Sequence, residues 1–251
     1  MHAETIDDVL KLLAQIVADN KARKDPLGYF PALYRQVTLK VKDGISQGIF
    51  DDNPRMKRFD ALFANAYFTA YDRYRNHGIT SASWQFAFDR AAPGQSIILQ
   101  NLLLAINAHV NLDLGVVTSA TFPPSKLDGF HSDFDRINAV LASLIPLARA
   151  AVEEFSPLLG ELAEVGGPDV ALALEFSVSA ARDEAWRAAT LMSLMPPDAR
   201  PLMVDALDAR TKLLGRVVAD PPEPVGAVVR RIQCAESTDV VAIITALDAL
   251  V

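Results

Sequence analysis

A histidine and an aspartate four residues apart, His109 and Asp113, lie in the most apolar stretch of the sequence, residues 96–118. At about 100° per residue, positions i and i+4 share one face of a helix, so both side chains would point the same way. Burying an imidazole and a carboxylate costs several kcal/mol unless each is paired or bound to something. The pair therefore marks a candidate site, with His109 as a metal ligand or a general base.

Two further aspartates are predicted to face the same interior from other helices. Asp133 falls beside apolar positions of the helix that follows a Pro-Pro loop, and Asp183 shares a face with apolar side chains of a later helix. One imidazole with several carboxylates suits Zn, Fe or Mn, and helix bundles build such sites from inward side chains on facing helices. We therefore expect a divalent metal as the candidate cofactor. Its expected ligands are His109, Asp113, Asp133 and Asp183, of which the first two and Asp183 are also the expected catalytic residues.

Such a site also needs side chains that hold a substrate. Aromatic rings from three segments could form an apolar lining, and a tyrosine among them could lend its hydroxyl. Two asparagines lie on the central segment, on the face opposite His109, and an arginine shares the face of Asp183. The predicted substrate-binding residues are Tyr67, Trp84, Asn107, Asn111, Trp186 and Arg187.

Three functions remain open for these residues. The first is a metal-dependent hydrolase or lyase acting on a small, partly apolar substrate. The second is a helical binding or structural protein with a buried polar network, because Arg136, Arg182 or Arg187 could pair with a buried aspartate without any metal. The third is a metal-free cyclase or isomerase of an apolar ligand. A second histidine near Asp113 or a Glu-x-x-His pair would favour the metal, and the sequence has neither.

Composition narrows the class of partner. The net charge of the 251-residue chain is −7, with basic and acidic residues mixed along it. This charge distribution does not favour binding to nucleic acid or to an anionic membrane surface. The single cysteine, Cys234, excludes an internal disulfide framework, and the acidic first residues lack the order of a signal peptide. A membrane span would not carry the following polar residues within about 20 positions: Gln100, Asn101, Asn107, His109, Asn111 and Asp113. We expect a cytoplasmic protein that binds a small molecule, while its oligomeric state is not indicated.

The apolar spacing predicts one helix after another and no pair of strands. In the helix of residues 54–77, the predicted buried face carries Phe59, Leu62 and Phe63, with Tyr67 and Tyr71 at its margin. Pro146 should kink or divide a helix of residues 125–156. The predicted helices are 4–19, 29–48, 54–77, a short one through 84–91, 96–118, 125–156, 169–194, 199–219, a short one through 228–232, and 237–250.

This pattern predicts an all-α fold, a multi-helix bundle with a polar pocket at its centre. We expect one domain over residues 1–251. Residues 1–28 would form an N-terminal helix and linker, and residues 198–251 would form C-terminal helices packed on the bundle.

Five blocks of the sequence carry a family pattern: Arg55-Met56 with 59–67 (Phe-Asp-Ala-Leu-Phe-Ala-Asn-Ala-Tyr), Ser83-Trp84 with 87–89 (Ala-Phe-Asp), 107–115 (Asn-Ala-His-Val-Asn-Leu-Asp-Leu-Gly), 133–135 (Asp-Phe-Asp) with Asn138, and 181–186 (Ala-Arg-Asp-Glu-Ala-Trp). They resemble those of a widespread bacterial, partly fungal, helical family catalogued only as a domain of unknown function. The resemblance runs from about residue 28 to 250, and block 107–115 is its most specific motif. It implies a helical fold and supports a site where the blocks hold His109, Asp113, Asp133 and Asp183. It brings no activity, cofactor or substrate.

Overall fold

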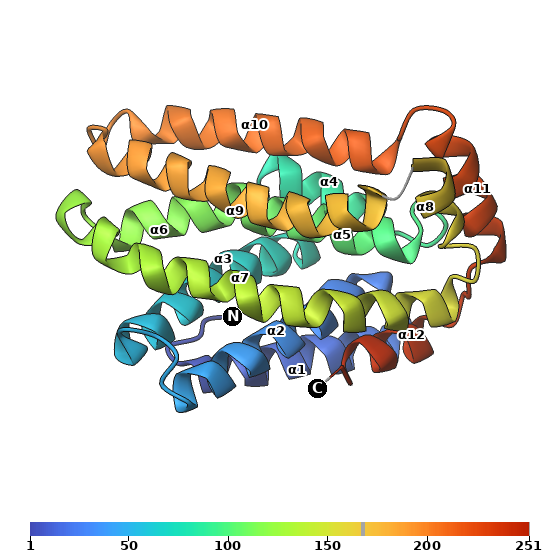
Figure 1. Cartoon of the computed structure of the whole chain (residues 1–251), viewed down its shortest axis with the longest axis horizontal. Coiled ribbons are helices and arrows are strands. Elements are labelled where there is room, and N and C mark those ends of the chain that lie inside the picture. Colours follow the sequence, from blue (N-terminus) through green and yellow to red (C-terminus); the bar gives the residue numbers. More distant parts are fainter. Residues whose placement is uncertain (167–168, 251) are drawn as a thin grey trace.

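The structure is a computed structural model that describes residues 1–166 and 169–250, with the backbone alone for residues 163, 165, 166 and 169–177. Within these residues the fold is all-α, as predicted (Figure 1). In chain order the elements are α1 (Ile6–Arg23), η1 (Pro26–Gly28), α2 (Tyr29–Ser46), α3 (Asn53–Arg75), α4 (Ala82–Arg90), α5 (Ile98–Ala108), η2 (His109–Leu114), α6 (Gly115–Thr121), α7 (Pro124–Phe155), α8 (Glu161–Gly166), α9 (Asp169–Leu194), α10 (Arg200–Ala219), α11 (Val225–Ala235) and α12 (Val240–Leu247).

Short polar side chains set the starts of several helices. Thr5 forms a capping box with Asp8 at the start of α1, and Asp52 and Ser81 accept hydrogen bonds from the first turns of α3 and α4. These side chains satisfy backbone N–H groups that have no partner within the helix. Pro146 was expected to kink or divide its helix, and α7 continues across it, so the helix is not divided there.

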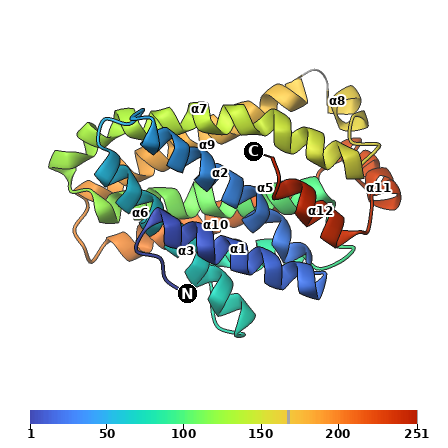
Figure 2. The ribbon, with the colours of Figure 1, turned by 90° about the horizontal axis from the view of Figure 1, so that it is seen from below.

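The segment α5–η2–α6 runs through the middle of the bundle. The helices α9 and α10 lie along one side of it, α7 crosses in front, and α1, α2 and α12 form the lower layer (Figures 1 and 2). By length and composition, Ile98–Thr121 is the one described helix that could cross a membrane, but 61% of its most apolar window is buried inside the bundle. A core helix passes the same test, and buried side chains from this segment contribute to each apolar cluster of the protein.

The buried face of α3 differs from the prediction by a rotation of the helix. Tyr67 and Tyr71, predicted at the margin, are buried at 1% and 6% exposure, whereas Leu62 is 44% exposed. Asp60 is buried on the same face as the two tyrosines. The reason is that this face meets other aromatic side chains, Phe30 and Trp84 among them, whose rings pack against Tyr67. A phenol ring buries as much apolar area as a leucine side chain or more.

The C-terminal helices pack on the earlier ones. α10 lies against α4 and α5, α11 against α8, and α12 against α2 and α7 (Figure 2). Asp248, just after α12, accepts a hydrogen bond from Nη1 of Arg35 at 2.8 Å, and its backbone carbonyl accepts one from Nε2 of Gln36 at 2.7 Å. The last helix is thereby held to α2 by polar contacts as well as by apolar packing.

Candidate functional site

The candidate site is built on an irregular turn of the central helix. Residues His109–Leu114 form a π-helix, η2, between two α-helical segments. A π-helical turn is bonded from i to i+5 and is rare, and such turns occur frequently at functional sites. The sequence predicted an uninterrupted α-helix here. The irregular turn coincides with the two residues that were singled out for their chemistry, His109 and Asp113.

His109 and Asp113 contact each other, as their spacing predicted, and a third residue joins them. One carboxylate oxygen of Asp113, Oδ2, accepts a hydrogen bond from Nδ1 of His109 at 3.0 Å and one from the indole Nε1–H of Trp84 at 2.9 Å. His109 is 3% exposed and Asp113 9% exposed. Because a carboxylate only accepts hydrogen bonds, this contact assigns the imidazole proton to Nδ1 and leaves Nε2 with a free electron pair when the ring is neutral.

Polar contacts also fix the position of Trp84. Ser81 caps α4, and the carboxylate of Asp208 on α10 accepts from the backbone N–H groups of Ala82 and Ser83 at 2.6 and 2.8 Å. The start of α4 is therefore tied to α10, and the indole is directed at Asp113 from a fixed helix end.

Aromatic rings surround the imidazole. Phe63 lies parallel to it, with ring centroids 3.8 Å apart and an angle of 7° between the planes. Tyr34 meets it edge-on at 4.9 Å, and Phe30, Trp84 and Tyr67 follow at 5.8, 6.0 and 6.3 Å. Phe63 is the half-buried member of this group, so it covers one face of the imidazole next to the surface. Of the predicted substrate-binding residues, Tyr67 and Trp84 do lie at His109.

Three buried polar atoms near this site have no hydrogen-bond partner among the described residues. They are Nε2 of His109, the hydroxyl oxygen of Tyr34 and Oδ2 of Asp60. Burial raises the pKa of Asp60 to about 7. It also raises the pKa of Tyr34 well above its usual value, and the negative charges of Asp60 and then of Asp113 add to that effect. The phenol therefore lies within electrostatic range of both carboxylates.

Sequence reasoning missed Asp60 and Tyr34, although the sequence contains a signal for Asp60. It precedes Ala64, Tyr67 and Tyr71 by four, seven and eleven residues, which is the spacing of one helical face. Once the tyrosines of α3 are placed in the core, the same periodicity places Asp60 there.

Asp133 is buried, as predicted, but it belongs to a different cluster. Its carboxylate accepts from Nη2 of Arg55 at 2.6 Å, from Nη1 of Arg136 at 2.9 Å, and from the backbone N–H groups of Asp51 and Asp52 at 2.6 and 3.2 Å. Burial alone would raise the pKa of Asp133, but the hydrogen bonds from Arg55 and the two backbone groups outweigh it and the pKa is lowered. This carboxylate fastens the loop between α2 and α3 to α7.

The predicted four-residue metal set is therefore not assembled. Asp183 is exposed on α9, and Asp133 is committed to its two arginines. Among the residues that the structure describes, no three His, Cys, Asp or Glu side chains are grouped so that they could hold one ion. The prediction failed because helical periodicity fixes which face a side chain occupies but not the height of that face relative to other helices.

The other predicted substrate-binding residues lie away from His109. Nδ2 of Asn107 donates to the backbone carbonyl of Thr211 at 2.8 Å, and Nδ2 of Asn111 donates to Oδ1 of Asn107 at 3.0 Å. Asn107 therefore joins the central helix to α10, and Asn111 holds the side chain of Asn107 in place. Arg187 is exposed and pairs with Glu184.

Trp186, on α9, packs against aromatic rings of α7. Its ring stacks on His131 with centroids 4.3 Å apart, and it lies 5.0 Å from the ring of Phe134. The buried Arg182 also contacts this group, with its guanidinium 4.3 Å from the centroid of Phe134. Trp186 therefore packs α9 onto α7 and does not line the site at His109.

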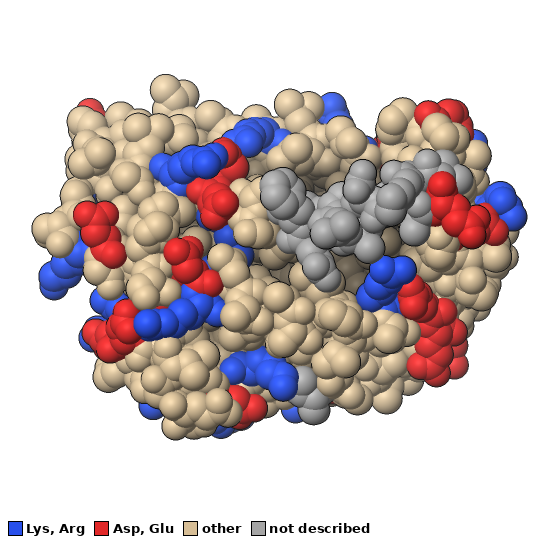
Figure 3. All heavy atoms as spheres, viewed as in Figure 1, with Lys and Arg blue, Asp and Glu red and all other residues tan. Residues whose placement is uncertain are grey.

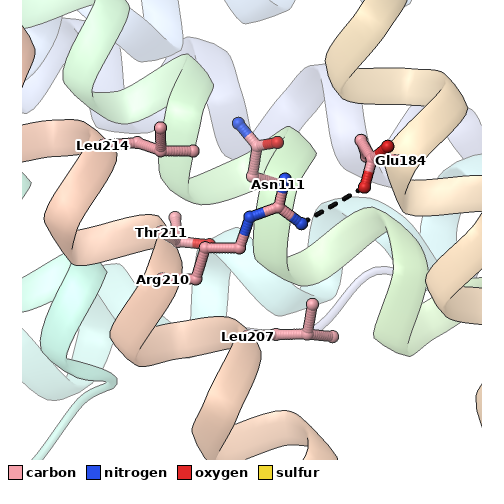
Figure 4. Close-up of a pocket in the computed structure, with 6 residues that line it drawn as sticks. All are labelled: Asn111, Glu184, Leu207, Arg210, Thr211 and Leu214. Carbon is pink, nitrogen blue, oxygen red and sulfur yellow. Dashed lines mark hydrogen bonds and ion pairs between the residues drawn. The ribbon is translucent and has the colours of Figure 1, made fainter.

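Of the cavities beside the described residues, we consider two, and neither is lined by His109 or Asp113. The smaller, of about 10 Å³, lies beneath the ion pair of Arg210 and Glu184 at 3.2 Å and reaches Asn111 (Figure 4). It has room for about one water molecule. The larger, of about 560 Å³, lies at the surface where the start of α1 meets α2 and α3. The face shown in Figure 3 mixes both signs of charge in its visible part.

Comparisons with known proteins place the chain in a family. The comparison with curated proteins and the comparison with solved structures each found no match. The model of a family of unknown function (DUF5995) matches residues 6–221, which include every candidate site residue and end before α11 and α12. The resemblance inferred from the sequence is thereby confirmed: the chain belongs to this family of unknown function, DUF5995.

Proposed function

We propose that the protein is an enzyme that moves a proton on a small, partly apolar molecule, with His109 as the general base. The observation that carries this proposal is the state of the imidazole: Nδ1 is held by Asp113, while Nε2 is buried and has no partner among the described residues. A base whose second nitrogen is oriented by a carboxylate has the arrangement that general-base catalysis uses.

The dyad suits proton uptake at Nε2. When Nε2 takes a proton, the ring becomes an imidazolium, and the carboxylate of Asp113 stabilises that charge at 3.0 Å from Nδ1. Trp84 donates to the same carboxylate oxygen and holds it in place. The surrounding rings limit the access of water, which strengthens the interaction between these charges.

The reaction class follows from which side chains could act as metal ligands at this site. A metal-dependent hydrolase needs more ligands than His109 and Asp113, and the carboxylates expected to supply them lie elsewhere. Proton transfer without a metal ligand set fits an isomerase, a cyclase or a lyase, because each can proceed through a carbon–hydrogen bond broken by a base.

Deuterium incorporation tests this proposal. The protein is incubated in D2O with a panel of small ketones, allylic alcohols and unsaturated esters, and deuterium in each compound is measured by mass spectrometry. We expect the wild type to label at least one compound, and His109→Gln to abolish the labelling. Asp113→Asn should slow it by roughly 10²–10⁴-fold, as when the orienting carboxylate of a dyad is lost. The surface variant Asp128→Asn serves as the control. Equal labelling by wild type and His109→Gln, or none by either, contradicts the proposal.

A second candidate, a helical binding or structural protein with a buried polar network, is favoured by the closure of the site. Both His109 and Asp113 are nearly inaccessible, and Asp113 receives two hydrogen bonds. In that case His109→Ala should cost about 2 kcal/mol, or roughly 4–8 °C in melting temperature, and leave no chemical phenotype. Unchanged stability of His109→Ala would count against it.

A further inference from the structure

Three elements that pack together around the site each carry a buried polar atom with no partner among the described residues. Tyr34 lies on α2, Asp60 on α3 and His109 on η2, and these three elements contact one another directly or through α5. The ring of Tyr34 is 4.9 Å from that of His109. Phe63, one turn after Asp60 on α3, stacks on the same imidazole. α3 therefore places a covering ring, Phe63, on His109, and one turn earlier a buried carboxyl group, Asp60, whose charge acts on the hydroxyl of Tyr34.

These buried atoms point to a ligand. A buried polar group without a partner costs about 1–3 kcal/mol, and proteins rarely leave several such groups together. Tyr34, Asp60 and His109 are each less than 9% exposed. A molecule that offers one oxygen to the tyrosine and the aspartic acid, and one acidic hydrogen to the imidazole, would satisfy all three atoms.

The residue types indicate what that oxygen does. A carboxyl group kept protonated by apolar surroundings, beside a tyrosine hydroxyl, presents two O–H donors, and such a pair stabilises the negative oxygen of an enolate. Burial places the pKa of Asp60 at about 7, so the group holds its proton below neutral pH. A ligand carrying its own negative charge would instead meet the carboxylate of Asp113 nearby.

We propose that Tyr34 and Asp60 bind the carbonyl oxygen of a small ketone or aldehyde and stabilise the enol formed when His109 removes the neighbouring hydrogen. The role of His109 as the base rests on the proposed function; the binding of the carbonyl does not. The carbon–hydrogen bond breaks and its electron pair forms the carbon–carbon double bond. The carbonyl π pair moves to oxygen, which takes the proton of Asp60, while Nε2 gains the carbon-bound proton. The reverse steps return both protons, so no co-reactant is consumed.

Phe63 is the side chain that must move to admit such a molecule. It is half-buried and lies flat on the imidazole, whereas the other rings around His109 belong mostly to the closed core. Phe63→Ala should therefore speed binding of a probe without removing any polar contact of the site.

The test uses acetophenone labelled with ¹³C at its carbonyl as the probe, and infrared spectroscopy of the full chain. We expect the carbonyl band of the bound probe to lie at lower wavenumber than in buffer, because two donors polarise it. Tyr34→Phe should recover part of that shift and Asp60→Leu most of it. Tyr34→Phe removes one oxygen and keeps the ring, so it remains informative if Asp60→Leu does not fold. A wild-type band at its position in buffer, or equal bands in wild type and Tyr34→Phe, overturns the proposal.

A second readout separates this proposal from the proposed function. Exchange of the methyl hydrogens of acetophenone for deuterium is followed by NMR in the same samples, with Asp128→Asn as the control. A shifted band without exchange in the wild type supports the carbonyl site and contradicts the role of His109. Exchange that is lost in His109→Gln, with an unshifted band, supports the base and overturns the carbonyl site. If neither signal is found, the carbonyl site is overturned, and the role of His109 is decided by the labelling of the other compounds of the panel.

Discussion

Asp113 and Asp60 are both buried, yet their carboxyl groups are held differently. Oδ2 of Asp113 accepts two hydrogen bonds, from His109 and Trp84. Oδ2 of Asp60 has no partner among the described residues, and burial raises the pKa of this group to about 7. One carboxyl group is thus suited to stabilise a cation, and the other to keep or give a proton.

The pKa of Asp60 makes stability depend on pH in a defined direction. Its pKa is raised from the usual 3.8 to about 7, so between these values the folded protein keeps a proton that the unfolded chain has lost. The resulting stability is fully present below about pH 4 and is lost as the pH rises through 7. It amounts to at most about 4 kcal/mol. Urea unfolding of wild type and Asp60→Asn should be measured between pH 4 and 8. The free energy of unfolding of the wild type, relative to that of Asp60→Asn, should fall as the pH rises over this range. A difference between the two that stays constant with pH would refute this linkage.

For individual residues, the sequence predicted contacts between side chains on one helix better than contacts between side chains on different helices. The contact of His109 with Asp113 followed from their spacing, because both lie on one backbone segment. The contact of Trp84 with Asp113 joins positions 29 residues apart, and their relative placement is set by how α4 packs on α10. Trp84 was therefore predicted as a lining residue but not as a hydrogen-bond donor to Asp113.

At the scale of elements, Asp133 shows that an inward carboxylate can serve packing alone. It joins α7 to the start of α3 and to the loop before it through Arg55 and two backbone N–H groups. The side chain of Asp133 is fully buried, so the ion pair is protected from solvent.

Asp133→Asn should lower the free energy of unfolding by about 3 kcal/mol, because it leaves two arginines next to a group without charge. Asp183→Asn, a change of the same kind at an exposed position, should alter it by less than about 0.5 kcal/mol. Chemical denaturation of both variants measures the difference. Exchange of deuterium into acetophenone should be the same in Asp133→Asn as in the wild type at temperatures where both are folded. Loss of exchange in a stable Asp133→Asn variant would mean that Asp133 takes part in the reaction after all.

The helices themselves were largely predictable, and their irregularities were not. The range 169–194 was predicted for α9 and is the range observed, because the sequence has helix-breaking residues on both sides, Gly-Gly-Pro before it and Pro-Pro after it. The π-helical turn at His109–Leu114 has no comparable signal in the sequence. It depends on how η2 fits against α3 and α9, and single-segment periodicity contains no information about that fit.

At the scale of the whole molecule, the last helix closes a core that begins near the N-terminus. The family match ends at residue 221, yet Ile243, Ile244 and Leu247 of α12 are at most 1% exposed and belong to one cluster with Tyr29. α12 therefore completes the apolar interior beneath α2.

Removal of residues 238–251 should destabilise the protein by about 5 kcal/mol or more, since three buried aliphatic side chains contribute about 1.5–3 kcal/mol each. Urea unfolding and the binding of an apolar dye would measure the loss. Asp248→Asn in the full chain is the matched control. It weakens the partly exposed pair with Arg35 and a long hydrogen bond from Gln36, and it should cost about 1 kcal/mol or less. A truncated chain as stable as the full one would mean that α12 is dispensable to the fold.

The irregular turn within the enclosed central helix has a consequence for motion. Amide hydrogens of α5 and α6 are shielded by the surrounding helices, so most should exchange with solvent deuterium only when the whole bundle opens. At His109–Leu114 the ladder of backbone bonds changes its spacing from four residues to five, and a local opening there breaks few contacts of the flanking turns. Time-resolved exchange should therefore show faster labelling of a few amides at His109–Leu114 than of the amides of α5 and α6 on either side. The most protected segment of the chain would then contain a short stretch that opens locally.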